Sequence, residues 1–312
     1  MEQRQLGSSG LRVSVVGLGC NQFRSKIDDA TVEATVGAAL DAGITLFDTA
    51  DIYGGRGGSE ESLGLALRGR RERALVATKF GMDMGDGEVA RGSRRYIRRC
   101  VEASLRRLQT DWIDLYQYHE PDNLTPLDET LAALDELVDE GKVRYIGSSN
   151  LAAWQVVDAE WIARSSHGER FISAQNRYSL LERDAERELA PACVRSGVGI
   201  LPFYPLAAGV LTGKYRRGEP PPAGTRLAGQ PARASEMLTE RTFALLDRLE
   251  AFGRERGKSL LEVAIAGLAS RPAVGSVIAG ATSPEQVTAN ARAGEWELSA
   301  EDRAALDAAL AG

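Results

Sequence analysis

A repeated alternation of short apolar segments and longer amphipathic segments constrains the fold of this chain more than any other feature. Successive apolar segments are mostly separated by the length of one βα module, which is about 30 residues. Such an alternation is typical of βαβ units that build a parallel sheet. The apolar segments are residues 13–16, 45–47, 75–78, 113–118, 143–146, 171–174, 199–202 and 274–279. Eight such units predict an α/β fold of the closed (β/α)8 barrel type. A doubly wound open sheet is the alternative, and it requires a reversal of strand order.

The segments between the apolar runs begin and end with residues that favour helix termini. Residues 30–40 follow two aspartates and end before Gly43, which suits the left-handed position after a helix. A helix at 127–138 is expected to have Pro126 as its first helical residue. Ser283 and Pro284 are expected to open the last barrel helix in the same way.

Three segments lie outside the repeat. Residues 4–12 predict a hairpin turn before the first barrel strand, and the tail from Ser299 predicts a final capped helix. Residues 206–239 form a long loop, and long loops in compact domains are usually functional or disordered. We therefore expect residues 1–312 to form a single barrel domain, within which 206–239 is a long cofactor and substrate loop.

Composition excludes several classes of protein. The net charge of −6 makes broad attraction to nucleic acid or to an acidic membrane unfavourable. Three scattered cysteines do not form a disulfide framework, and with only two histidines we expect no metal site. The first residues lack the apolar stretch of a signal peptide, and no segment is apolar over the length of a membrane span. We expect a cytoplasmic protein with no nucleic-acid partner and no membrane partner. No feature of the sequence specifies an oligomeric state.

Charged and polar residues follow consecutive apolar segments. Asp48 follows residues 45–47, Lys79 follows 75–78, and His119 follows 113–118. In (β/α)8 barrels, functional residues gather at the carboxyl ends of the strands. These three side chains are therefore expected to meet at one end of the barrel, with Tyr53 in the loop above them.

These four residue types form a coherent set for delivering a proton to a carbonyl oxygen. A free phenol has a pKa of about 10, and a neighbouring ammonium favours its ionised form. Lys79 is therefore expected to lower the pKa of Tyr53, while Asp48 keeps the lysine charged and oriented. A neutral His119 would donate a hydrogen bond to the carbonyl oxygen. Each residue alone has an ordinary structural explanation, and the prediction depends on the four occurring together.

Motifs around these residues resemble the aldo-keto reductase superfamily over nearly the whole chain. The resemblance implies a (β/α)8 barrel whose bottom is closed by the N-terminal hairpin. It also implies NADPH or NADP+ at the carboxyl ends of the strands and a catalytic tetrad of Asp48, Tyr53, Lys79 and His119. The motifs are GITLFDTADIYG at 43–54, ATK at 77–79, YQYHEPD at 116–122, GKVRYIGSSN at 141–150, QNRY at 175–178, PL at 205–206, GVLTGK at 209–214, and GATSPEQ at 280–286 with Asn290.

The same resemblance assigns residues to parts of the cofactor. Ser149, Asn150 and Gln175 would hold the nicotinamide carboxamide, and Phe203 would stack on the nicotinamide ring. Two further groups would contact the pyrophosphate and the adenosine end. The first is Tyr204, Pro205, Leu206, Gly209, Lys214 and Arg226, and the second is Gly280, Thr282, Gln286 and Asn290. A helix that starts at Ser283 suits a phosphate, because the amino end of a helix favours negative charge.

Four positions depart from the family pattern. Ala289 stands where glutamate is frequent, Gln286 where arginine is frequent, and Tyr204 where serine is frequent. The expected 2′-phosphate pocket is therefore less cationic than in many members, which leaves NADH open as a second coenzyme. Asn21 stands where some members have a substrate-facing tryptophan, which predicts a different or roomier substrate pocket.

Three functions are compatible with these observations. The first is an enzyme, an NADP(H)-dependent oxidoreductase that reduces a small-molecule aldehyde or ketone. The second is an NADP(H)-binding regulatory or redox-sensing subunit with weak turnover, because some members of the family are partners of membrane channels. The third is an isomerase or aldolase that uses Lys79 as a Schiff base, although Asp48 would keep that lysine protonated. Substrate specificity is expected to lie in the loops 21–26, 54–58, 83–90 and 206–239.

Overall fold

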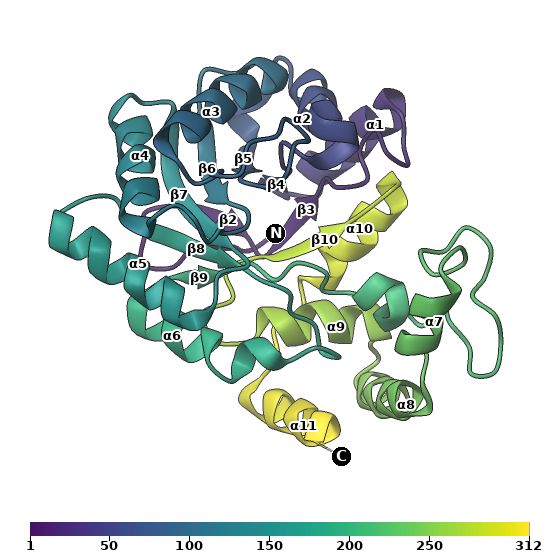
Figure 1. Cartoon of the computed structure of the whole chain (residues 1–312). Helices are drawn as coiled ribbons and strands as arrows, with labels where there is room; N and C mark the ends of the chain where they lie inside the picture. The colour runs from purple at the N-terminus through teal and green to yellow at the C-terminus, as the bar shows by residue number, and fades with distance from the viewer. Residues whose placement is uncertain (312) are drawn as a thin grey trace.

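Eight parallel strands form the centre of the computed structural model, which describes residues 1–311 (Figure 1). The order of neighbouring strands is β10-β3-β4-β5-β6-β7-β8-β9, so strands that follow one another in the chain lie side by side. The strands are β3 (Val16–Gly19), β4 (Leu46–Asp48), β5 (Leu75–Phe80), β6 (Ile113–Tyr118), β7 (Val143–Ser149), β8 (Phe171–Gln175), β9 (Gly199–Ile200) and β10 (Val277–Gly280).

Backbone hydrogen bonds join the two ends of this strand order. The N–H of Gly275 donates to the carbonyl of Ile200 at 3.0 Å, and the N–H of Ile278 donates to the carbonyl of Pro202 at 3.0 Å. Ile200 and Val274 also form a parallel bridge. The sheet therefore curls round on itself as a (β/α)8 barrel, as predicted, and is not a doubly wound open sheet.

Helices surround the strands on the outside of the barrel (Figure 1). Both termini of α1 confirm the punctuation seen in the sequence. The Asp28 side chain accepts a hydrogen bond from the N–H of Thr31, and Gly43 has φ 79° just after the end of α1. Pro126 is the residue before the first helical residue of α4, one position earlier than predicted. The helices outside the strands are α1 (Asp29–Asp41), α2 (Tyr53–Ala66), α3 (Arg94–Leu108), α4 (Leu127–Asp139), α5 (Ala153–Ser166), α6 (Leu189–Ser196), α9 (Leu260–Ala269) and α10 (Pro284–Ala293), with the 3-10 turns η1 (Arg71–Arg73) and η2 (Asp184–Glu186) between them.

The first barrel strand lies later in the chain than predicted. Residues 13–16 were expected to form it, but β2 (Arg12–Ser14) pairs antiparallel with β1 (Gln3–Gln5) in the hairpin, and the barrel strand is β3. Two glycines weaken the strand pattern in β3. A Cβ at Gly17 would lie 2.7 Å from the Ile278 side chain, so a larger residue there would require that side chain of β10 to shift.

The N-terminal hairpin closes the bottom of the barrel. Leu6, Leu11 and Val13 form one buried cluster with side chains that line the barrel interior. Gly7 has φ 58°, and a Cβ there would lie 2.8 Å from the backbone nitrogen of Gly199 at the start of β9. The hairpin therefore covers the amino ends of the strands, and the carboxyl ends are left for a site.

The segment 206–239 is not a simple loop. It contains the 3-10 segment η3 (Ala207–Thr212) and the short helix α7 (Pro231–Met237), and α8 (Glu240–Glu255) follows. The last helix, α11 (Ala300–Ala311), begins as predicted after Ser299, whose side chain accepts from the N–H of Asp302 at 3.0 Å. α11 is attached to α8 by an ion pair between Arg256 and Asp302 at 2.6 Å.

Three further observations concern the chain as a whole. The three cysteines are free thiols, and all are buried. Within residues 1–311, no helix has the length and apolar character needed to cross a membrane. In the same part of the chain, no group of three or more His, Cys, Asp and Glu side chains could hold a metal ion.

Candidate active site

Three of the four tetrad residues come from neighbouring strands and meet at the carboxyl ends of those strands. Asp48 is the last residue of β4, Lys79 lies near the end of β5, and His119 directly follows β6. The Lys79 Nζ donates to Asp48 Oδ2 at 2.7 Å and to the carbonyl of Thr49 at 2.8 Å. The backbone N–H of His119 donates to the carbonyl of Phe80 at 2.8 Å, which places the backbone of His119 beside β5.

Tyr53 completes this group from the start of α2. Its ring lies next to the ammonium of Lys79, whose Nζ is 5.0 Å from the ring centroid. The rings of Tyr53 and His119 are 5.8 Å apart and meet edge to face at 86°. The structure therefore brings together all four residues that the sequence predicted would act as a set.

Burial controls the acidity of Tyr53. Loss of solvent raises the pKa of the phenol above its ordinary value, while the charge of Lys79 acts in the opposite direction. The sequence-based expectation that Lys79 would lower the pKa is therefore correct for that contact but wrong for the net direction. A raised pKa keeps the phenol protonated at neutral pH, which is the form that can donate a proton.

The side chain of Lys79 is charged, whereas that of His119 is neutral. Burial alone would lower the pKa of Lys79, but Asp48 and Tyr53 outweigh it, so the pKa is raised and the ammonium stays charged. Burial, helped by the charge of Lys79, lowers the pKa of His119 to about 3, so the imidazole is neutral. Its Nδ1 is buried with no hydrogen-bond partner among residues 1–311. A proton on Nε2 avoids an unpaired buried N–H and makes Nε2 a donor.

The residues expected to bind the nicotinamide carboxamide are linked to the tetrad by hydrogen bonds. Ser149 ends β7 and Gln175 ends β8, and the two are register partners in the sheet. The Asn150 side-chain nitrogen donates to the carbonyl of His119 at 3.0 Å. The Gln175 side-chain nitrogen donates to Asp48 Oδ1 at 2.7 Å. These three polar side chains therefore lie directly beside the tetrad.

Gln117 belongs to the same network and was missed by sequence reasoning. It lies in β6 and is fully buried, and it is the register partner of Lys79 in β5. Its side-chain nitrogen donates to Asp48 Oδ1 at 3.2 Å. In the sequence it stands inside an apolar run, Leu-Tyr-Gln-Tyr, where only its polarity could have drawn attention to it.

Cations gather around Tyr204 on the loop after β9. The loop starts beside Gln175, because the N–H of Phe203 donates to the carbonyl of Asn176 at 3.1 Å. The guanidinium carbons of three arginines lie 4.7 to 5.3 Å from the Tyr204 ring centroid. They are Arg226, which the sequence predicted, and Arg177 and Arg233, which it did not, because they come from separate elements.

The predicted pyrophosphate residues form one compact turn beside these arginines. Leu206 precedes η3, and its carbonyl accepts from the N–H of Gly209 at 2.8 Å. Gly209 has φ 85°, and a Cβ there would lie 2.5 Å from Lys214 Nζ, so the lysine crosses directly over the glycine. Lys214, Arg226 and Arg233 form no ion pair with any of residues 1–311. The turn is therefore a cationic surface that suits an anion.

The predicted adenosine residues lie two strands from Asp48. Gly280 pairs with Gly19, which also pairs with Asp48, so all three lie at the same level of the barrel. The Gln286 side-chain oxygen accepts from the N–H of Thr282 at 2.9 Å, and so closes the start of α10. Asn290 is buried one turn further along α10.

Two of the predicted substrate loops touch each other. Gly54, Gly55, Arg56 and Gly57 all have positive φ, between 65° and 112°, so the regular part of α2 begins after them. A Cβ at Gly85 would lie 2.5 Å from the Arg56 guanidinium. The loops 54–58 and 83–90 therefore meet above the strand ends, on the side of Tyr53.

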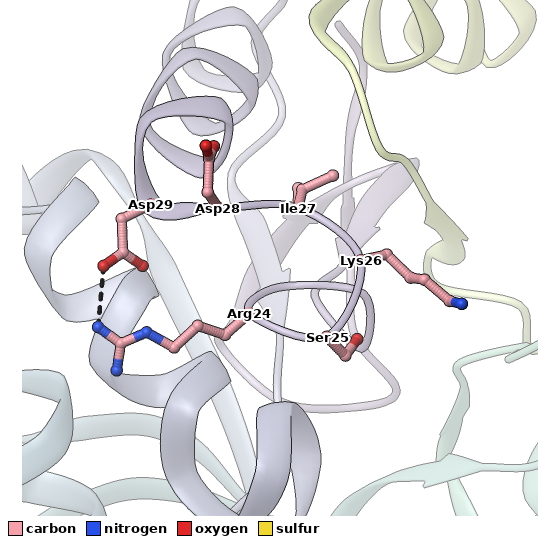
Figure 2. Close-up of a pocket in the computed structure, with 6 residues that line it drawn as sticks. All are labelled: Arg24, Ser25, Lys26, Ile27, Asp28 and Asp29. Carbon is pink, nitrogen blue, oxygen red and sulfur yellow. Dashed lines mark hydrogen bonds and ion pairs between the residues drawn. The ribbon is translucent and has the colours of Figure 1, made fainter.

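The loop after β3 encloses a small surface hollow of about 350 Å3, lined by residues 24–29 (Figure 2). Figure 2 shows the Arg24 side chain turned toward Asp29, and the two form an ion pair at 2.8 Å. None of the four tetrad residues lines this hollow. The hollow is therefore separate from the tetrad.

Comparisons with known proteins identify relatives of this chain. The sequence model of the aldo/keto reductase family matches residues 15–311. The chain is 40% identical over 312 residues to a Bacillus subtilis protein named as the uncharacterised oxidoreductase YrpG, with 96% of this chain and 93% of that protein covered. It is 36% identical to the versiconal hemiacetal acetate reductase of Aspergillus parasiticus, with 87% and 86% covered. It is also 36% identical to a probable voltage-gated potassium channel subunit beta of Oryza sativa subsp. japonica, with 94% and 91% covered.

Proposed function

The chain belongs to the aldo/keto reductase family of oxidoreductases, and on that premise we propose that it reduces an aldehyde or ketone to an alcohol with NADPH as the hydride donor. The observation that carries the proposal is the arrangement of Tyr53 between the charged Lys79 and the neutral His119. In this arrangement Tyr53 is a proton donor and His119 is a neutral hydrogen-bond donor, and both would act on the carbonyl oxygen of the substrate.

The residues present suit a nicotinamide dinucleotide. Lys214, Arg226 and Arg233 have no acidic partner in residues 1–311, and a pyrophosphate supplies the missing negative charge. The carboxamide would be held by Ser149, Asn150 and Gln175, with Phe203 on the ring. Gly280, Thr282, Gln286 and Asn290 would contact the adenosine end, where the amino end of α10 favours phosphate. Tyr204, Pro205, Leu206 and Gly209 would shape the surface for the pyrophosphate. NADH remains a second coenzyme to be tested.

In this proposal the protein controls a single proton. When bound, the nicotinamide supplies a hydride to the carbonyl carbon. Tyr53 holds its proton at neutral pH, since burial raises its pKa, and it donates that proton to the carbonyl oxygen as negative charge develops there. Lys79 stabilises the phenolate that remains, and Asp48 fixes the lysine in place. His119 donates from Nε2 and orients the carbonyl oxygen.

A second function is favoured by two relatives. The rice protein and an Arabidopsis thaliana protein, which is 34% identical over 301 residues, are both named as probable voltage-gated potassium channel subunits beta. A regulatory or redox-sensing subunit would bind NADPH and turn over slowly. All four tetrad residues are present and assembled here, so we propose the enzyme first.

We also propose a cytoplasmic location and a small-molecule carbonyl partner. The basic side of α3 does not favour nucleic acid, because four of its six arginines, Arg94, Arg98, Arg99 and Arg107, already have acidic partners. Arg98 pairs with Glu140 at 2.7 Å, and Arg107 pairs with the buried Glu60 at 2.6 Å. Salt-dependent binding to a nucleic acid at physiological ionic strength would contradict this part of the proposal.

The test is NADPH consumption with a panel of aldehydes and ketones by the wild type and by Tyr53→Phe. Coenzyme binding is followed separately by the quenching of tryptophan fluorescence. We expect turnover by the wild type, and a loss of about 100-fold or more in kcat for the variant with unchanged NADPH binding. Tight NADPH binding without turnover of any carbonyl in the panel would favour the regulatory subunit. No nicotinamide coenzyme binding at all would make the reductase proposal wrong.

A further inference from the structure

Gln117 connects the coenzyme side of the site to the proton-delivery side. Its side chain is fully buried inside the barrel, where a polar group is costly unless it is hydrogen-bonded. Its nitrogen donates to Asp48 Oδ1 at 3.2 Å, and its oxygen accepts from the Gln175 nitrogen at 3.3 Å. The Gln117 side chain therefore forms hydrogen bonds both with the carboxylate of Asp48, a tetrad residue, and with the amide of Gln175, which is predicted to bind the coenzyme.

The two amides hold the Asp48 carboxylate in one orientation. Oδ1 accepts from Gln175 at 2.7 Å and from Gln117 at 3.2 Å, while Oδ2 accepts from Lys79 at 2.7 Å. Both oxygens are therefore engaged by donors from different strands. The plane of the carboxylate is fixed, and its second oxygen is kept pointing at the lysine.

The same bonds fix the amide of Gln175. A glutamine side chain has two N–H donors on its nitrogen and one oxygen acceptor. The Gln175 nitrogen donates to both Asp48 and Gln117, so its donors are used within the barrel. Its oxygen accepts no hydrogen bond from residues 1–311. That oxygen is the acceptor which the N–H of a nicotinamide carboxamide requires.

The neighbouring strand leaves room for this arrangement. Gly147 in β7 is the register partner of Gln117, and a Cβ there would lie 3.3 Å from the Gln117 side chain. The same Cβ would lie 2.3 Å from Ser173 Oγ. Glycine at 147 is therefore part of the packing that lets the Gln117 amide reach across the barrel toward Asp48.

We propose that Gln117 is a positioning residue that orients the Gln175 amide for carboxamide recognition and, in the same network, holds the Asp48 carboxylate toward Lys79. This inference rests on the proposed function, since it takes the ligand to be a nicotinamide coenzyme. Gln117 acts through Gln175 and Asp48, and it touches neither coenzyme nor substrate itself.

The test uses two coenzymes and the variant Gln117→Met, which removes both hydrogen bonds while nearly preserving side-chain shape. The second coenzyme is the NADPH analogue in which a 3-acetyl group replaces the carboxamide, so that the N–H for Gln175 is missing. The dissociation constants of both are measured by fluorescence titration. We expect the variant to weaken NADPH binding by about three- to tenfold, the equivalent of one hydrogen bond, and to change analogue binding by less than about twofold.

A second pair of variants separates positioning from general disturbance of the barrel. Ser173→Ala alters a buried hydroxyl with no partner in the same barrel interior, two residues before Gln175, and is expected to leave both dissociation constants unchanged. Gln175→Met is expected to show the same selective loss as Gln117→Met. The double variant should be no worse than either single variant, because the two residues act as one unit.

Equal weakening of NADPH and analogue by Gln117→Met, or additive losses in the double variant, would overturn the proposal. If Gln117→Met does not accumulate as folded protein, Gln117→Leu provides the same measurement with a different shape. Failure of the wild type to bind NADPH would instead contradict the proposed function. Binding by the wild type together with an unselective Gln117 variant would contradict this inference alone.

Discussion

The buried carboxyl group of Asp51 makes a quantitative prediction about stability and pH. Asp51 is 1% exposed, and neither of its carboxyl oxygens has a hydrogen-bond partner within residues 1–311. Burial, reinforced by the charge of Glu60, raises its pKa from 3.8 to about 8, although Arg107 acts in the opposite direction. The folded protein therefore binds this proton more tightly than the unfolded chain does.

The direction in which stability changes with pH follows from this difference in the pKa of Asp51 between the folded and unfolded states. Between pH about 4 and about 8 the folded state holds more protons than the unfolded state, so the contribution of Asp51 to stability decreases as the pH rises. One pKa unit corresponds to about 1.4 kcal/mol, so the total loss is at most about 6 kcal/mol above pH 8. Only about 2 kcal/mol of this loss has occurred at pH 5, which leaves about 4 kcal/mol between pH 5 and pH 9.

The perturbation is Asp51→Asn, which keeps the shape but cannot ionise. We expect the variant to gain stability relative to the wild type by up to about 4 kcal/mol as the pH rises from 5 to 9. For a chain of 312 residues this corresponds to a relative gain in Tm of about 6 °C. Thermal unfolding followed by circular dichroism at each pH unit measures it. Asp158→Asn, an exposed acid on α5, is the matched control and should show no trend. A difference in Tm that stays flat with pH, or that favours the wild type at pH 9, would refute the reasoning.

Three other variants, one of them a double substitution, have effects whose directions follow from the structure. Lys79→Met removes the cation beside the phenol and should reduce kcat by about 100- to 10,000-fold with little change in NADPH affinity, as steady-state kinetics can check. Replacing Arg226 and Arg233 by glutamine should raise the Kd for NADPH by at least about threefold and reduce its dependence on salt, and a titration at several ionic strengths would detect a failure of either effect. Arg107→Met leaves the fully buried Glu60 without its cation and should destabilise the fold by about 3–5 kcal/mol in denaturant unfolding, whereas an unchanged midpoint would contradict this.

Much of the barrel was predictable because its strands and helices are encoded locally. Apolar runs and helix-terminal residues identify α1, α10 and most of the strands. β3 was misplaced because Gly17 and Gly19 have no strand preference of their own, although the Ile278 side chain packs closely against both of them. Closure of the sheet between Ile200 and Val274 depends on residues far apart in the chain, which no local pattern encodes.

The candidate site was predictable for a different reason. Asp48, Lys79 and His119 follow consecutive strands, and the ends of parallel strands meet in space. Gln117 was missed because strand periodicity does not distinguish a buried amide from an apolar neighbour. Arg177 and Arg233 were missed because they approach Tyr204 from different elements. The net direction of the Tyr53 pKa was missed because burial depends on the whole fold.

The central claim is that one proton from Tyr53 accompanies one hydride from the nicotinamide. The most direct measurement is the transfer of deuterium to an aldehyde from NADPH that carries deuterium at both hydrogen positions of nicotinamide C4, with the alcohol analysed by mass spectrometry for the wild type and for Tyr53→Phe. The account predicts that the wild-type product carries one deuterium on its carbinol carbon and that the variant forms at least about 100-fold less of it. An unlabelled alcohol from the wild type, or an equal yield from Tyr53→Phe, would contradict it.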